Sequence, residues 1–359
     1  MAQIDVFGPK ILQCVPMFGR NNARDVENTS QEVYISVQKM TNTLDKILGI
    51  DYPIIAAPMF LISNTKMTIA ALNSGISGAF PALNYRTDAE LRSAIDTIKA
   101  ASNKPFGVNL IVNKSNPKYK KQLDTLVEVK VPYIITSLGN PSEVIDRCKP
   151  LGTKVFCDVV DLKYAQKVEK LGADAIIAVN NRAGGHCGPM SPKELITMLK
   201  ENCGLPIISA GGIGTGKDLA QVMQWGAAGA SIGTIFIACE ESDVSPEYKQ
   251  AMIDYGEKDI VLTTKLSGSH LTVINTPYVQ QIGTKAGWLE SLMLKNKTLK
   301  KWAKMFVAFR GMKAVETAAT KPTYKTVWCA GPSIEYVTSI RPMRDIIGQL
   351  ITEWKQTTL

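Results

Sequence analysis

Residues 206–236, PIISAGGIGTGKDLAQVMQWGAAGASIGTIF, contain two short apolar runs separated by a glycine-rich turn and an amphipathic segment. The runs PIISAGG and GASIGTIF have the length and the β-branched content of buried strands. The segment between them begins at Thr215 and carries apolar residues at helical spacing after a capping threonine. A strand, a helix and a second strand in this order predict a parallel βαβ unit.

Six further apolar runs precede this stretch at intervals of roughly 25 residues. They are IIAAPM (54–59), SGAFPA (77–82), FGVNLIV (106–112), YIITSL (133–138), KVFCDVV (154–160) and AIIAVN (175–180). Capped amphipathic segments lie between them, as in TDAELRSAIDTIKA and SPKELITMLKENCG. Continuous apolar strands that alternate with helices are covered on both faces. Eight such units predict an α/β fold of the (β/α)8 TIM-barrel type, with a doubly wound open sheet as the alternative.

The barrel pattern divides the chain into three parts. We predict an N-terminal extension over residues 1–50, a barrel over 51–258 plus 331–359, and an insertion over 259–330. Large apolar residues recur in the insertion at three- and four-residue steps, at Trp288, Leu292, Leu299, Trp302, Phe306 and Phe309. This spacing predicts a helical cap subdomain with a lysine-rich outer face. The final segment, SIEYVTSIRPMRDIIGQLITEWKQ, predicts a closing helix on the barrel exterior.

The composition is that of a globular enzyme, with 45% hydrophobic and 20% charged residues and no apolar run long enough to cross a membrane. The N-terminus lacks the pattern of a secretory signal, so we expect a cytoplasmic protein. The net charge of +9 is local, because ten basic and two acidic residues lie between Lys285 and Lys325 and leave 31 and 30 elsewhere. A binding module for nucleic acid or anionic membrane is therefore not expected. Seven cysteines without a CxxC spacing argue against a disulfide framework and against a metal site.

Glycine turns follow the last two predicted strands. In a parallel α/β barrel the active site lies at the carboxyl ends of the strands. Gly211 and Gly212 end one strand and precede a helix, and Gly233 and Thr234 follow the next strand. Glycines let the backbone approach an anion, and the free N–H groups at a helix start favour a phosphate. The two turns together predict a phosphate site, whereas either turn alone is equally well explained as a tight connection.

One of the two histidines lies in NNRAGGHCGPM, residues 180–190, at the end of an apolar run. The turn before it permits contact with a flat ligand, so His186 is expected over the mouth of the barrel. An imidazole with a pKa near neutrality can take a proton or stabilise an anion there. The alternative is an ordinary surface or supporting histidine. His270 lies outside the predicted strand ends and is expected to be structural or peripheral. Cys187 is expected to be a small buried residue, with a reactive thiol as the alternative.

Asn109 and Asp158 are polar residues in otherwise apolar strands. Burial of Asn109 without partners would cost on the order of 1–3 kcal/mol, so its amide needs hydrogen bonds. A heteroaromatic ring with amide-like edges would supply them, and so would neighbouring backbone groups. The same argument applies to Asp158.

Several of these motifs occur together in one known family. In chain order they are DYPIIAAPM, LNSGISGAFPA, FGVNLIV, NRAGGHCG, LPIISAGGIGTGKDLAQVMQWGAAGASIGTIFIACEES and WCAGPSIEYV. From about residue 44 onward the chain resembles the nitronate monooxygenase family, formerly called 2-nitropropane dioxygenases. These are FMN-dependent TIM-barrel enzymes, grouped with flavin-dependent enoyl-ACP reductases and NADH:quinone reductases. The resemblance implies FMN as cofactor and His186 as the catalytic base toward nitroalkanes.

The resemblance and the strand-end positions together give a set of expected cofactor contacts. Within it, Asn109 is expected at the polar edge of the isoalloxazine and Gly185 near the ribityl or phosphate group. The full set is Ala57, Pro58, Met59, Asn109, Asp158, Ala183, Gly184, Gly185, Ala210, Gly211, Gly212, Gly233 and Thr234.

The chain also departs from the family pattern near the expected substrate. Arg182 stands where many members have glutamate, GTIF replaces GTRF, and a late segment rich in arginine and proline is SGSHLTV here. We expect Arg182 to bind substrate by adding positive charge beside an anion.

The predicted function is FMN-dependent oxidation of alkyl nitronates, and of nitroalkanes, by O2 to carbonyl compounds and nitrite. The alternative is a flavin reductase of a quinone or an enoyl thioester that uses NADH or NADPH. In that alternative the basic segment 285–325 would meet a dinucleotide phosphate or an acyl carrier protein. A homo-oligomer is compatible with the sequence.

Overall fold

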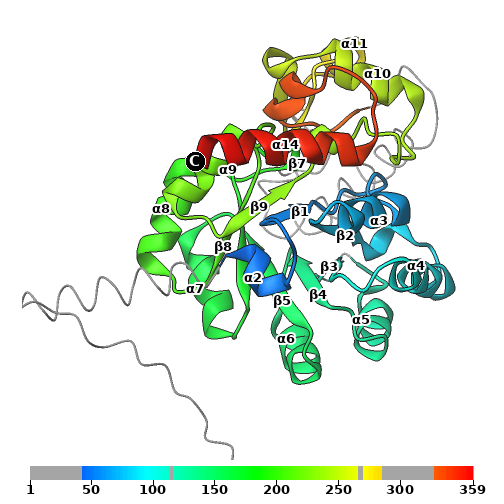
Figure 1. Cartoon of the computed structure of the whole chain (residues 1–359), viewed down its shortest axis with the longest axis vertical. Helices are drawn as coiled ribbons and strands as arrows, with labels where there is room; N and C mark the ends of the chain where they lie inside the picture. Colours follow the sequence, from blue (N-terminus) through cyan, green and yellow to red (C-terminus); the bar gives the residue numbers. More distant parts are fainter. Residues whose placement is uncertain (1–42, 114–115, 266–269, 285–326, 359) are drawn as a thin grey trace, which may run out of the picture. The chain divides into compact units, whose positions relative to one another are not determined.

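Eight parallel strands close into a barrel in the computed structural model, which describes residues 43–113, 116–265, 270–284 and 327–358 (Figure 1). The strand order is β1-β2-β3-β4-β5-β6-β8-β9, and β9 pairs with β1 to close the ring. The bounds are β1 Ile54–Ala56, β2 Ser77–Pro81, β3 Gly107–Ile111, β4 Tyr133–Ser137, β5 Lys154–Val159, β6 Ala175–Val179, β8 Ile207–Ala210 and β9 Gly229–Ile232. All eight predicted runs form strands, so the TIM-barrel prediction is confirmed.

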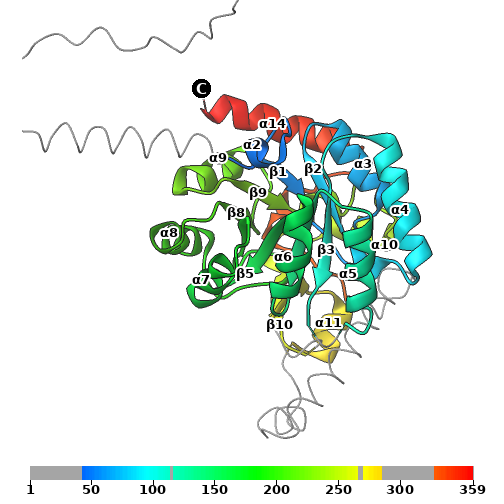
Figure 2. The same cartoon turned by 90° about the horizontal axis from the view of Figure 1, so that it is seen from below.

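Helices surround this barrel on the outside (Figures 1 and 2). The helices between the strands are α3 Thr65–Asn73, α4 Asp88–Ala101, α5 Tyr119–Glu128, α6 Ser142–Cys148, α7 Leu162–Lys170, α8 Pro192–Asn202 and α9 Gly216–Trp225. Helix α14, Met343–Thr358, packs on α9 and α3 as the predicted closing helix. A side chain at Gly216 would overlap the backbone of α14, which shows how closely the two helices approach.

Shorter elements connect and cover these units. They are the 3-10 turns η1 Ala82–Asn84, η2 Lys149–Leu151, η3 Thr234–Phe236, η4 Glu257–Asp259 and η5 Pro332–Tyr336, and the helices α2 Leu44–Leu48, α10 Pro246–Asp254 and α11 Pro277–Ile282. Helix α2 closes the N-terminal end of the barrel, because Leu44 and Leu48 pack into its interior cluster. The amide of Leu44 also donates to the carbonyl of Ala228 at 2.8 Å. The structure therefore attaches residues 44–48 to the barrel, although the sequence pattern placed its start at residue 51.

Along each strand, side chains alternate between the interior and the exterior of the barrel. Ile55, Ile135, Phe156, Ile177 and Ile208 belong to one buried interior cluster. Because strand side chains alternate between faces, the residue two positions further along each strand faces the same interior at its carboxyl end. These positions hold Ala57, Ser137, Asp158, Val179 and Ala210, and on β3 the equivalent residue is Asn109. The fold thus gathers the predicted strand-end residues at one end of the barrel.

The region after residue 259 begins with strands. β10, Ile260–Thr263, pairs antiparallel with β11, Leu271–Ile274, and β11 pairs with the two-residue strand β7, Gly185–His186. The sequence had predicted a helical insertion here, but Ile260–Thr263 and Leu271–Ile274, both rich in β-branched residues, pair as antiparallel strands. The predicted helices around Trp288–Phe309 and the basic segment 285–325 lie outside the described residues. No helix among the described residues is long and apolar enough to span a membrane.

Candidate active site

Asn180 connects the turns that follow β6 and β8. Its side chain is almost fully buried, and its Nδ2 donates to the carbonyl of Gly211 at 3.0 Å. Its Oδ1 accepts the backbone N–H of Arg182 at 2.8 Å, while its own N–H bonds the carbonyl of Ala210. Asn180 was not among the residues predicted from the sequence. The signal was present, because it is a polar residue at the end of an apolar run, as Asn109 is.

The glycines of these turns are required by close packing. Gly211 has φ of +115°, and a Cβ there would overlap the backbone nitrogen of Ala183. A Cβ on Gly184 would lie 2.9 Å from the backbone nitrogen of Gly331 and 3.1 Å from the Thr234 hydroxyl. The turns after β6, β8 and β9 are therefore in contact with one another.

Two of these turns hold backbone donors without protein partners. Among the described residues, no acceptor takes a hydrogen bond from the N–H groups of Gly211, Gly212, Gly233 or Thr234. Buried backbone N–H groups are nearly always paired with protein, water or ligand. Thr234 is buried and the three glycines are half-buried. Their four donors on neighbouring turns form a set that an anion can satisfy.

The start of helix α9 offers fewer free N–H groups for a phosphate than the sequence predicted. The carboxylate of Asp218 accepts the N–H groups of Gly214 and Thr215 at 3.0 and 2.9 Å. The carboxylate of Glu353, from α14, accepts the N–H of Gly216 at 2.9 Å. The Thr215 hydroxyl accepts the N–H of Asp218. Fewer N–H groups are therefore free at this helix start than the sequence predicted, because protein oxygens already accept from four of them. A phosphate site here would therefore rest mainly on the two glycine turns.

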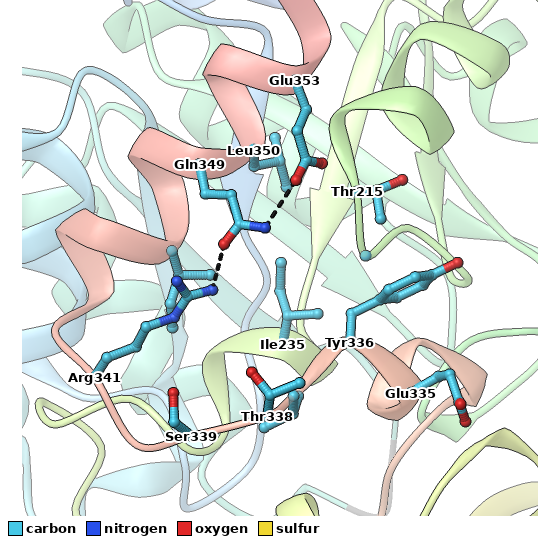
Figure 3. Close-up of a pocket in the computed structure, with 13 residues that line it drawn as sticks. Thr215, Ile235, Glu335, Tyr336, Thr338, Ser339, Arg341, Gln349, Leu350 and Glu353 are labelled. Atoms are coloured by element: carbon cyan, nitrogen blue, oxygen red, sulfur yellow. Dashed lines mark hydrogen bonds between the residues drawn. The ribbon is translucent and has the colours of Figure 1, made fainter.

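A cavity of about 240 Å³ lies on the outer side of this helix start, between η5, α14 and the turn before α9 (Figure 3). In it, Gln349 accepts a hydrogen bond from Arg341 and donates one to Glu353 (Figure 3). None of the predicted cofactor residues lines this cavity. We therefore place the chemistry at the carboxyl ends of the strands, where the glycine turns and the polar interior residues are, and not in this cavity.

Polar side chains from three neighbouring strands form a hydrogen-bonded chain at the same end of the barrel. Asn109 Nδ2 donates to the carbonyl of Ile135 at 3.1 Å and to Ser137 Oγ at 2.6 Å. Ser137 Oγ donates in turn to Asp158 Oδ2 at 2.5 Å. Asn109 and Asp158 are thus brought together through Ser137, which the sequence analysis missed because a serine after YIIT carries little signal.

The environment of Asp158 changes its acidity. Burial raises the pKa of the carboxyl to about 6, since desolvation penalises the charged form, and the hydrogen bond from Ser137 opposes the rise only in part. A carboxyl with such a pKa exchanges a proton near neutral pH, which is common at functional sites.

His186 is held by strand pairing rather than by a flexible loop. It lies opposite Leu271 in the β7–β11 ladder, and the Thr272 hydroxyl donates to the carbonyl of Ala183 in the preceding turn. The imidazole is exposed, but the protein atoms around it lower its pKa by displacing part of its water. It is therefore neutral at pH 7 and can accept a proton.

Three neighbouring residues clarify the remaining predictions. Arg182 pairs with Glu257, with Nη2 and Oε1 2.9 Å apart, so the structure gives its charge a protein partner instead of leaving it free for a substrate. Burial raises the pKa of the Cys187 thiol, which agrees with an unreactive cysteine. His270 is exposed, and its carbonyl accepts the N–H of Cys187.

Residues at the end of β1 complete the arrangement. A Cβ on Gly233 would lie 3.1 Å from the sulfur of Met59 and 3.5 Å from Cβ of Ala57, so the turn after β9 packs on the turn after β1. A closed (β/α)8 barrel that presents backbone donors, a neutral imidazole and a polar chain at the carboxyl ends of its strands has the arrangement of an enzyme active site.

The chain belongs to the nitronate monooxygenase family, whose model matches residues 41–353. It is similar to a probable nitronate monooxygenase of Staphylococcus aureus (strain Newman), at 27% identity over 299 residues, 71% of this chain and 84% of the relative. A Rhodococcus jostii (strain RHA1) relative is 29% identical over 274 residues, 76% of this chain and 75% of its own. That relative is named (3aS,4S,5R,7aS)-5-hydroxy-7a-methyl-1-oxo-octahydro-1H-indene-4-carboxyl-CoA dehydrogenase.

Among solved structures, FabK from Thermotoga maritima is similar at a TM-score of 0.76 and 28% identity, over 88% of this chain and 96% of FabK. Family membership makes the protein a flavin-dependent oxidoreductase.

Proposed function

We propose that the protein uses FMN and O2 to oxidise alkyl nitronates to carbonyl compounds and nitrite, with neutral nitroalkanes as further substrates. The observation that carries the proposal is the set of four N–H groups that have no acceptor among the described residues, on turns packed against the turn that presents His186. One cluster of turns would then bind the phosphate and place the base that accepts the substrate proton.

The residues present fit FMN. Its phosphate would be held by the N–H groups of Gly211, Gly212, Gly233 and Thr234. Both amide protons of Asn109 are used within the protein, so its Oδ1, which accepts no hydrogen bond from the described residues, is left for the N–H of a flavin ring. The orientation of this amide is fixed, because the carbonyl of Ile135 can only accept.

Bound FMN would supply the electron acceptor and the reaction with O2. The protein's own contribution is to bind the ring and to move a proton at His186. A neutral nitroalkane must lose a proton from carbon before it is oxidised, and the neutral imidazole of His186 would accept it. A preformed nitronate needs no such step.

The second candidate is a reductase that uses NADH or NADPH to reduce a quinone or an enoyl thioester. The observation in its favour is that the Rhodococcus jostii relative is named as a dehydrogenase of a carboxyl-CoA compound, which is a thioester. An acyl carrier protein would be a partner only in this second case.

Anaerobic mixing of the FMN-loaded protein with propyl-2-nitronate, NADH and NADPH, each alone, separates the two functions. Absorbance of the flavin is followed, and oxygen is then admitted. Reduction by the nitronate with release of nitrite supports the proposal. Bleaching by a pyridine nucleotide alone supports the reductase, and failure to take up FMN contradicts both.

The role of His186 is tested by His186→Asn. We expect the rate with neutral nitroalkanes to fall by about 10²–10⁴-fold and the rate with nitronates to change little. The base is active when deprotonated, so wild-type activity on nitroalkanes should fall as pH drops through a pKa below the ordinary value near 6.5. His270→Asn is the matched control, because this exposed histidine lies on the neighbouring segment and should leave both rates unchanged.

A further inference from the structure

The hydrogen-bonded chain at the ends of β3, β4 and β5 has a fixed direction. Asn109 donates to Ser137, and the single proton of the Ser137 hydroxyl is donated to Asp158 Oδ2. A hydroxyl that already accepts from an amide and donates to a carboxyl can satisfy only one carboxyl oxygen. Oδ1 of Asp158 receives no hydrogen bond from the described residues.

Asp158 also lacks a compensating positive charge. The titratable groups around it are Cys157 on the same strand and Tyr164 on α7, and burial raises the pKa of both thiol and phenol to about 12. Both are therefore neutral across the physiological range. The factors that set the acidity of Asp158 are burial and Ser137, and no lysine, arginine or histidine of the described chain is among them.

Asp158 follows Phe156 by two residues on β5, so it faces the barrel interior at the end where the glycine turns lie. On the proposed function, an anionic nitronate binds at that end. An ionised carboxylate without a cation disfavours a second negative charge in a poorly solvated site, whereas a protonated carboxyl can donate a hydrogen bond to it.

We propose that Asp158 is a specificity-determining residue that holds a proton when an anionic substrate is bound and that excludes this substrate when it ionises. The raised pKa of about 6 makes the exchange relevant near neutrality. The carboxyl is protonated below this pKa, so anion binding is strongest there and weakens as pH rises through it. This inference rests on the proposed function for the identity of the anion.

Nitrate provides a direct test, because it is planar, resembles the nitro group and does not titrate between pH 5 and 8. Its dissociation constant is measured from the change in flavin absorbance of the FMN-loaded protein. Above pH 6 we expect the wild-type constant to rise by up to about tenfold per pH unit, as for a binding step linked to one proton. Asp158→Asn should lose this rise, and His186→Asn should keep it.

Ser137→Ala distinguishes titration of Asp158 from a structural effect of replacing this residue. Removal of the hydroxyl deletes the bond that lowers the pKa of Asp158, so the midpoint of the nitrate profile should move to higher pH. An infrared carboxyl band that disappears near pH 6 in the wild type, and is missing in Asp158→Asn, would give the same assignment without any ligand.

Three results would overturn the inference: a wild-type nitrate affinity independent of pH, an unchanged profile in Asp158→Asn, or no nitrate binding. These results are distinct from a failure of the proposed function, which would appear as a flavin that nitronate does not reduce. Each variant is first checked for its flavin absorbance, since retained FMN shows that the barrel has folded.

Discussion

The two halves of the barrel's carboxyl end are built from different chemistry. One half, the glycine side, consists of the turns after β6, β8, β9 and β1, and presents backbone N–H groups. The other half, the polar side, consists of Asn109, Ser137 and Asp158 at the ends of β3, β4 and β5, and presents side-chain oxygens. His186 stands at the edge of the glycine side, on a strand that pairs with β11.

This difference predicts which side of the site responds to pH. Backbone donors cannot titrate, and their positions are set by φ angles and by close packing, so the glycine side should bind an anion equally well at any moderate pH. The polar side contains a carboxyl with a pKa near 6, so its charge should follow the pH of the medium. Substitutions of the turn glycines should therefore affect the strength of binding, whereas substitutions on the polar side should affect the pH dependence of anion binding.

The largest expected effect on the glycine side comes from Gly211→Ala. The new Cβ would overlap the nitrogen of Ala183 and lie 2.5 Å from Oδ1 of Asn180, in addition to the strain at φ of +115°. Gly172→Ala is the matched control, since Gly172 has φ of +89° and open space around a Cβ. We expect the control to lose about 1–2 kcal/mol and Gly211→Ala to lose roughly 1–3 kcal/mol more, with loss of FMN.

Urea unfolding of the FMN-free proteins measures these losses, and flavin absorbance measures retention. Equal unfolding free energies for the two variants would show that the turns after β6 and β8 are not tightly packed, and would remove the basis of the comparison.

Asn180→Ala tests whether one amide holds the glycine side together. It removes the bonds to Gly211 and Arg182 and leaves the backbone groups of two half-buried residues without these partners. The expected loss is about 1–3 kcal/mol in unfolding free energy, with weaker FMN binding. Asn202→Ala, at an exposed amide, should change stability by less than about 0.5 kcal/mol. An FMN affinity equal to wild type in Asn180→Ala would show that the turns hold their shape without this residue.

The barrel was predictable because local sequence patterns specify its strands and helices. Eight apolar runs with capped helices between them specify parallel strands, and each of these runs became a strand. Of the two carboxylates that accept N–H groups at the start of α9, only one could be predicted from the sequence. The Thr215–Asp218 capping box is a local signal, whereas Glu353 comes from a helix that lies 137 positions away in the chain. Contacts of that kind depend on the packing of α14, which no local pattern encodes.

The site was predictable to the same extent. Asn109 could be recognised because an amide in an apolar strand needs partners, and the structure gives it both Ile135 and Ser137 while leaving its Oδ1 open. Ser137 gave no signal, since a serine at a strand end is common. The pairing of His186 with β11 also escaped prediction, because it joins residues that are far apart in the sequence.

Gly185→Ala probes the space on the glycine side rather than its packing. Gly185 has φ of +73°, and a Cβ there would meet no atom of the described residues within 4 Å. The unfolding free energy of Gly185→Ala should therefore match that of Gly172→Ala. If FMN passes over this position, the variant should bind FMN about tenfold more weakly, which corresponds to about 1.4 kcal/mol. Isothermal titration with FMN decides the point, and an unchanged affinity would place the cofactor elsewhere.

The smallest effect is expected from Glu257→Gln, which releases Arg182 from its ion pair. Both side chains are partly exposed, at 39% and 49%, so solvent screens the pair and the unfolding free energy should change by less than about 1 kcal/mol. The side chain of Arg182 also packs against Gly212, since a Cβ added there would lie 2.9 Å from Cβ and 3.0 Å from Nε of Arg182. A lower KM for nitronate in Glu257→Gln, with unchanged FMN affinity, would show that Arg182 can reach the substrate once it is free. An unchanged KM, reproduced in Arg182→Gln, would show that the residue only supports the turn.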